Sequence, residues 1–129
     1  MRTPTSARAL VAGGVAAAAL MFAGSPAFAG TDANVYTTNN AGSGAFHTSG
    51  SVERMQACDE KANDGLYPVL ELKYGGKEHV LPNIGDDPDC RNSTINIPEG
   101  TSVKVRIYLN RPGSDTHNYH ASSWHNATA

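Results

Sequence analysis

The chain has 129 residues, of which 40% are hydrophobic, with 10 Lys and Arg against 12 Asp and Glu and only two Cys. This length suits one small domain. Doubly wound nucleotide enzymes, barrel enzymes and multi-helix membrane proteins are excluded, because each needs more chain or a different hydrophobic pattern.

The first 29 residues have the pattern of a secretory signal peptide. Residues 1–8 carry two arginines, residues 9–22 are a run of 14 mostly apolar residues, and Ala27-Phe28-Ala29 places small residues before a cut at Gly30. A membrane anchor is the weaker alternative, because a spanning helix needs roughly 20 apolar residues. The sequence therefore predicts a secreted protein, extracellular or associated with the cell wall, whose mature chain is residues 30–129.

The charge of the mature chain argues against two kinds of partner. Loss of Arg2 and Arg8 from the ten basic residues leaves eight against twelve acidic ones, a net charge of about −4 with His neutral. The remaining basic residues are spread singly along the chain. Nucleic acids and anionic membranes attract clustered Lys and Arg, so neither is expected as a partner after the signal is removed.

The two cysteines of an exported chain are expected to pair. Cys58 and Cys90 lie 32 positions apart, and no thiol-catalysis signature surrounds either of them. A disulfide that closes a loop of this length stabilises the fold by about 3.5 kcal/mol. The alternative, a Cys58 nucleophile with His79 or His120 as its base, needs a free thiol, which export disfavours.

The composition of the mature chain changes at Ala45. Residues 30–44 are small and polar, and we expect them to form a flexible lead-in. From Ala45 to the end, short apolar runs alternate with clusters of Gly, Pro, Asn and Asp. This pattern predicts an all-β domain over residues 45–129.

Two early strands can be assigned from their alternation. Residues 52–58 place Met55 and Ala57 on one face, and residues 66–74 place their leucines on one face with Glu71 and Lys73 opposite. Pro68 lacks a backbone donor, so it predicts an edge position or an irregular start for the second strand.

The second strand is expected to turn into a hairpin. Gly75-Gly76 supplies the two positive φ angles of a type I′ turn, and residues 77–81 form the returning strand. Thr101–Asn110 is the best strand, with Val103 and Val105 on its buried face. The other expected segments are a loop at 82–89, a strand at 93–97, a loop at 111–118 and a closing strand at 119–124.

Six or seven short strands in roughly 85 residues predict the fold class. We expect a small antiparallel β-sandwich, immunoglobulin-like or Greek-key in topology, with one disulfide. A barrel of similar size is the alternative.

The clusters of His and acidic residues favour structural roles over metal binding. His117, His120 and His125 could hold a transition metal, but their spacing fits no helical zinc motif and an odd separation on a strand points two of them to opposite faces. The acidic stretches Asp59–Gly65 and Asp86–Asp89 suit turns better than calcium loops, because the glycine of the first stands at the seventh place instead of the sixth. The Cys58–Cys90 bridge could still bring Asp59 and Asp89 close together. We expect no metal and no cofactor.

No catalytic residues are predicted. The sequence has no G-x-S-x-G elbow, no H-E-x-x-H and no phosphate-binding glycine loop. A sandwich of this size also leaves little room for a deep, supported pocket. We therefore expect that the protein is not an enzyme.

Three aromatic residues form the candidate binding surface. Tyr108 falls on the polar face of its strand, and Tyr119 and Trp124 follow near the end of the chain. Exposed aromatic side chains often anchor binding surfaces. The alternative is that Trp124, the single Trp, closes one end of the core.

A set of short motifs resembles a loose group of small secreted actinobacterial β-proteins of unknown function. The resemblance spans roughly Val52 to Trp124 and implies secretion and a β fold, with no activity. The matching positions are Cys58-Asp59, Asp64-Gly65, Cys90, Pro98-Glu99-Gly100, Val103, Val105 and Arg106.

Taken together, these patterns predict a secreted protein that binds an unidentified protein or cell-wall component without catalysis. The alternative is an inhibitor of an extracellular hydrolase, which would use a rigid protruding loop at 82–89 or 111–118. The chain resembles the actinobacterial amylase inhibitors in size and class only, because their Trp-Arg-Tyr tripeptide is missing.

Overall fold

The computed structural model describes residues 30–85 and 89–129, and for residues 114–117 the backbone alone. The predicted signal peptide, residues 1–29, lies outside this range. The described residues form nine strands and no helix. They are β1 (Ala33–Tyr36), β2 (Gly42–Ser49), β3 (Val52–Asp59), β4 (Tyr67–Tyr74), β5 (Lys77–Pro82), β6 (Cys90–Ile95), β7 (Ser102–Arg111), β8 (Ser114–Tyr119) and β9 (His125–Thr128).

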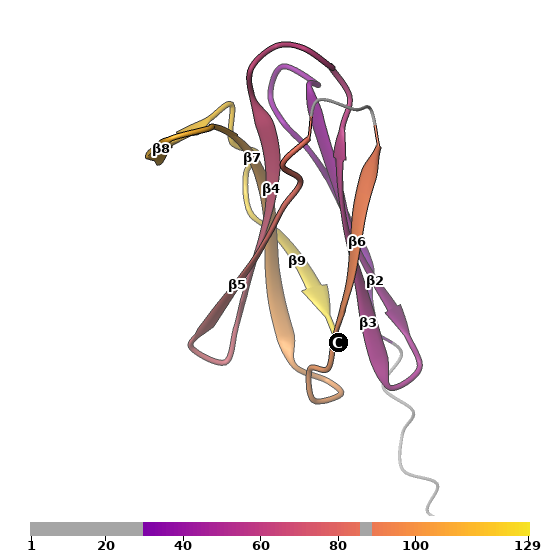
Figure 1. The fold of residues 1–129 in the computed structure, drawn as a ribbon. Helices are drawn as coiled ribbons and strands as arrows, with labels where there is room; N and C mark the ends of the chain where they lie inside the picture. The colour runs from indigo at the N-terminus through magenta and orange to yellow at the C-terminus, as the bar shows by residue number, and fades with distance from the viewer. Residues whose placement is uncertain (1–29, 86–88) are drawn as a thin grey trace, which may run out of the picture.

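The strands make two antiparallel sheets. One has the order β1-β2-β3-β6, and the other has the order β5-β4-β7-β8, with β9 paired to the remaining part of β7. The sheets pack face to face as two layers (Figure 1). This arrangement confirms the predicted small antiparallel sandwich. The barrel alternative was wrong, because the strands form two sheets and not one closed sheet.

The core lies between the inner faces of the two sheets. Phe46 and Met55 enter it from β2 and β3, and Leu70, Leu72 and Val105 enter it from β4 and β7. All five are fully buried, and a side chain of this size contributes about 1.5 to 3 kcal/mol when it leaves water. The alternation read from the sequence is therefore what holds the two layers together.

One glycine sets how closely the sheets approach. Gly44 in β2 faces the core, where a Cβ atom would lie 2.5 Å from the Cδ1 atom of Leu70. Two carbon atoms cannot pack at this distance. Leu70 therefore occupies the space that the missing side chain leaves open.

The predicted hairpin is confirmed. β4 and β5 pair from Tyr74 and Lys77 outward, and Gly75 and Gly76 have φ angles of 52° and 73°. The expectation of an edge position for Pro68 was wrong, because β4 lies between β5 and β7. Pro68 is the second residue of β4 and is opposite Leu109 of β7, and the ladder with β5 begins one residue later, at Val69.

The structure differs from the sequence expectation at the beginning of the domain. Residues 30–44, expected as a flexible lead-in, contain β1 and the start of β2. Val35 is fully buried, and Ala33 is nearly so. A short strand at the edge of a sheet can pack with small side chains. The small and polar composition of this segment therefore did not indicate β1.

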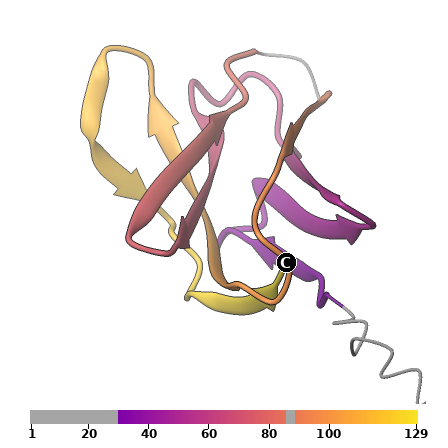
Figure 2. The same ribbon diagram turned by 90° about the horizontal axis from the view of Figure 1, so that it is seen from below.

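The end of the domain also differs. The predicted loop at 111–118 is mostly β8, and the predicted strand at 119–124 is mostly the connection from β8 to β9. His120 has a φ of 52°, which ends the strand there. The β7–β8 hairpin projects from the body of the sandwich in both views (Figure 1, Figure 2).

The predicted disulfide is confirmed. Cys58 of β3 and Cys90 of β6 are directly opposite each other in the ladder and are bonded. β6 is the edge strand of its sheet, so the bond fastens that edge. In the described part of the chain, no helix has the length and apolar character needed to cross a bilayer.

Candidate functional site

Charged and aromatic side chains gather on the outer face of the second sheet, where β4 and β7 run side by side. In their ladder Glu71 is opposite Arg106, and Lys73 is opposite Lys104. Inner and outer positions alternate along each strand, so these four side chains point away from the core. Together with Tyr108 and Trp124 they are called the Trp124 face below.

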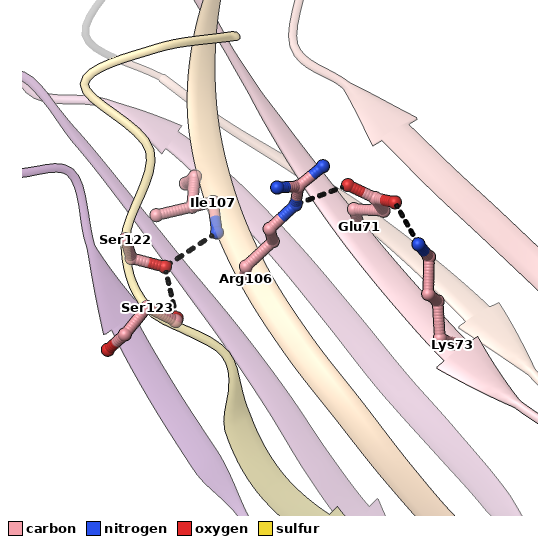
Figure 3. A network of polar contacts seen from close by, with 6 residues as sticks. All are labelled: Glu71, Lys73, Arg106, Ile107, Ser122 and Ser123. Carbon is pink, nitrogen blue, oxygen red and sulfur yellow. Dashed lines mark hydrogen bonds and ion pairs between the residues drawn. The ribbon is translucent and has the colours of Figure 1, made fainter.

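A buried carboxylate lies at the centre of the Trp124 face. The side chain of Glu71 is only 4% exposed, although it is on the outer side of the sheet. The Nε atom of Arg106 donates a hydrogen bond of 2.6 Å to its Oε2 atom, and the Nζ atom of Lys73 is 3.6 Å from its Oε1 atom (Figure 3). Two cations therefore compensate for the removal of this carboxylate from water.

Trp124 lies over both cations. The Cζ atom of Arg106 is 4.5 Å from the centre of the indole, and the Nζ atom of Lys73 is 4.9 Å from it. Both distances are within the range of cation–π attraction. The indole remains partly exposed. It is not part of the core cluster, so the alternative in which Trp124 closes one end of the core was wrong.

The chain before β9 explains this position of Trp124. The ladder of β9 with β7 ends at the pair His125 and Val105, and one further step places Trp124 beside Arg106. The backbone then leaves the ladder. The Oγ atom of Ser122 accepts a 3.1 Å hydrogen bond from the Ile107 amide and donates one of 2.8 Å to the Ser123 carbonyl (Figure 3).

The other two predicted aromatic residues do not join Trp124 in one exposed patch. Tyr108 is on the Trp124 face, but it is only 9% exposed. Burial, with a smaller effect from the Glu71 charge, raises the pKa of the Tyr108 phenol above its usual value. Tyr119 is partly exposed on β8, where the Cζ atom of Arg111 is 5.8 Å from its ring centre. Of the three predicted aromatic residues, Trp124 is thus the best placed for a ligand.

The three histidines considered as metal ligands are not brought together as a described group. His120 is in the turn after β8, and His125 begins β9. The side chain of His117 lies outside the described residues. Among the side chains that the structure does describe, no group of three His, Cys, Asp or Glu could hold a metal ion.

The first acidic stretch forms turns. The Oδ1 atom of Asp59 accepts a hydrogen bond from the Lys61 amide, and that of Asp64 accepts one from the Leu66 amide. Each is a local side-chain turn of the kind that Asp favours. Within the second stretch, residues 86–88 lie outside the described range.

A second polar pair lies on the outer face of the first sheet. The Nδ1 atom of His47 is 3.0 Å from the Oδ2 atom of Asp32, and the Thr48 amide donates to Oδ1. These hydrogen bonds, first that of His47, lower the pKa of Asp32 below its usual value. Both side chains are almost half exposed, so the pair is a surface contact.

Sequence reasoning missed the charged members of the Trp124 face. Glu71 and Lys73 were assigned to the face opposite the leucines of their strand, but nothing in a single sequence shows that β4 pairs with β7. A hollow of about 170 Å³ adjoins the face at the β4–β5 hairpin. It is lined by Lys73, Tyr74, Gly76, Lys77 and Glu78.

Comparisons with protein-family models, curated proteins and solved structures found no match to this chain. The resemblance to small secreted actinobacterial β-proteins therefore stays a prediction.

Proposed function

We propose that this protein is exported and acts without catalysis, binding a component of the cell wall or the surrounding medium through the Trp124 face. The observation that carries the proposal is the partly exposed indole of Trp124 above a buried carboxylate and two cations. Removal of the Glu71 carboxylate from water costs free energy. Simple polar side chains could cover this sheet face without that cost. The arrangement gives the face a fixed charge pattern and a rigid aromatic surface, which suit recognition.

The contacts of Glu71, the buried acid of the Trp124 face, support non-catalytic action. Glu71 is held between Arg106 and Lys73, so its oxygens serve to position two cations. The neighbouring hollow of about 170 Å³ is smaller than a pocket for a small-molecule substrate, which usually measures 300 Å³ or more. A surface ligand is the better match for this geometry.

Export is supported by the disulfide together with the sequence of residues 1–29. A disulfide in a small β-domain is compatible with an extracellular protein. All nine strands lie after the predicted cut at Gly30. Expression of the full chain in a bacterial host that exports proteins tests this point, since intact mass should identify residues 30–129 in the medium. A full-length product that stays with the cells would contradict it.

Binding is tested with the exported protein itself. Wall and medium fractions are passed over the immobilised protein, beside a Lys73→Gln/Lys104→Gln variant and a Lys61→Gln control. Lys61 is exposed on the turn after β3, away from the Trp124 face, so its replacement removes a lysine charge elsewhere. We expect a component that the wild-type and control proteins retain and the face variant loses. Equal retention by all three would contradict a role for this face.

Inhibition of an extracellular hydrolase is the second candidate function. The observation that favours it is the β7–β8 hairpin, which projects from the sandwich (Figure 1). Arg111, Pro112 and Gly113 are exposed at its turn. A protruding, rigid turn can enter an active-site cleft with little loss of entropy. A panel of hydrolases assayed with the wild-type protein and an Arg111→Ala variant tests it, and no inhibition of any enzyme would weigh against it.

A further inference from the structure

Two lysines of the Trp124 face, Lys73 and Lys104, lie side by side but differ in their ion pairs. Lys73 and Lys104 are directly opposite in the β4–β7 ladder, an arrangement that costs stability in an exposed pair. Lys73 shares Glu71 with Arg106. Lys104 is exposed and makes no ion pair with any residue of the described ranges. The pair therefore leaves positive charge available at one place on the sheet.

The neighbours of this lysine pair suit hydroxyl and carboxylate groups. On β9, the exposed Asn126 is opposite Lys104 and adds an amide that can both donate and accept. Adjacent strands lie about 4.8 Å apart, so two lysines on neighbouring strands can reach the oxygens of one carboxylate. Hydrogen bonds between ammonium and carboxylate groups are among the stronger ones in proteins.

Trp124 supplies the other half of a ligand site beside the two lysines. The negative face of an indole attracts the positively polarised C–H bonds of a sugar ring, and it offers a flat apolar surface of matching width. The indole is already held by Arg106 and Lys73. Its orientation is thus fixed before any ligand arrives, which lowers the entropy cost of binding.

The net charge of the chain further limits the class of ligand that the Trp124 face can bind. Residues 30–129 carry eight basic and twelve acidic residues, so the protein as a whole does not attract a polyanion. Binding has to depend on short-range contacts at one place, which is unlike nucleic-acid recognition through many phosphates. A polymer that carries both rings and carboxylates offers these contacts repeatedly along an open sheet face.

We propose that the Trp124 face binds an acidic polysaccharide, with a sugar ring against Trp124 and its carboxylate between Lys73 and Lys104. This inference rests on the proposed binding function and names its ligand class. Carboxylate and ring are both required. Neutral polysaccharides and anionic polymers without rings are therefore poor ligands.

The test uses the exported protein and three probes. Polygalacturonate carries rings and carboxylates, its methyl-esterified form carries rings without the charge, and poly(glycerol phosphate) carries charge without rings. Trp124 is the only Trp in the chain, so its fluorescence reports directly on the proposed site. We expect polygalacturonate to change the fluorescence in a saturable way and to bind at least about ten times more tightly than either other probe.

Variants then assign the contact. Lys104→Gln should weaken polygalacturonate binding about tenfold and leave the melting temperature unchanged or higher, because it removes one charge of a repelling pair. Lys61→Gln should change neither quantity. Equal binding of the esterified polymer, equal binding of poly(glycerol phosphate), or full affinity in Lys104→Gln would each overturn the inference.

Failure of the ligand class can be told apart from failure of the binding function. Suppose that polygalacturonate does not bind, but wall fractions still contain a component that Lys73→Gln/Lys104→Gln loses. The inference then falls, and the proposed function stands. If neither polygalacturonate nor any fraction distinguishes the face variant from wild type, both fall.

Discussion

Arg106 and Glu71 form a 2.6 Å hydrogen bond on the outer face of a sheet, yet the carboxylate is almost fully buried. The two residues are directly opposite in the β4–β7 ladder, and Trp124 lies over the guanidinium. An ion pair outside the core is thus protected from water by an aromatic side chain. This protection makes the pair a determinant of stability, whereas an exposed ion pair contributes little.

Replacement of Arg106 by Met should lower the free energy of unfolding by about 2 to 4 kcal/mol, because among the described residues it leaves the buried Glu71 with Lys73 as its single cationic partner. The double variant Glu71→Leu/Arg106→Met should recover most of this loss, since no charge then remains buried. Urea denaturation measures both. A double variant as unstable as the single one would show that packing of the Arg106 stem, and not the charge, accounts for the effect.

The Cys58–Cys90 bond joins β3 to the edge strand β6. Replacement of both cysteines by Ser should lower the free energy of unfolding by about 3.5 kcal/mol, because the unfolded chain regains the freedom of the closed loop. Urea denaturation of the double variant, with wild type under reducing and non-reducing conditions as controls, measures the loss. Reduced wild type and the variant should agree, and an unchanged midpoint would contradict the prediction.

Local signals predicted the elements that depend on neighbours in the sequence. Gly75-Gly76 defines its hairpin because two positive φ angles in succession favour one turn type. The alternation of Ser102–Arg111 defines β7 because one face must be apolar. The disulfide followed from the predicted export and from having only two cysteines.

The features that depend on distant pairing could not be predicted. Glu71 and Arg106 are 35 positions apart, and no local pattern shows that their strands are adjacent. Trp124 lies on the outer face because one step beyond the pair of His125 and Val105 places it beside Arg106, and no local pattern shows that β9 pairs with β7. β1 has too few apolar residues to stand out, although Val35 is fully buried.

Gly44 should not tolerate even one methyl group. Gly44→Ala would place a Cβ atom 2.5 Å from Leu70, so the sheets must separate or Leu70 must leave its rotamer, at a cost of about 1 to 3 kcal/mol. Thermal unfolding measures the loss. Gly85→Ala is the matched control, because a Cβ atom there meets nothing within 4 Å. Combination with Leu70→Val should relieve part of the strain, and no relief would place the strain elsewhere.

The Asp32–His47 contact should be visible in the pH dependence of stability. The pKa of Asp32 is lowered in the folded protein, so its contribution is present above the ordinary value of 3.8 and is lost as the pH falls through the lower folded value. His47→Ala should move the pKa of Asp32 up toward 3.8, since His47 is the largest cause of the shift. Titration of the carboxyl carbon by NMR measures it, and an unmoved pKa would assign the shift to the Thr48 amide alone.

Ser122 should control the position of Trp124. Its Oγ atom is the acceptor for the Ile107 amide, so Ser122→Ala leaves that amide without this bond, at a cost of about 1 to 3 kcal/mol. The segment before Trp124 is then attached to β7 by one bond fewer, with the 2.8 Å bond from the Ser122 amide to the Ile107 carbonyl retained, and the indole should become more exposed. Its fluorescence should therefore shift to longer wavelength, and because the chain has one Trp the shift has one source. Ser123→Ala is the matched control, since Ser123 takes part through its carbonyl and keeps that group in the variant. A stable Ser122→Ala protein with unchanged fluorescence would mean that the position of Trp124 does not depend on the Ser122 hydroxyl.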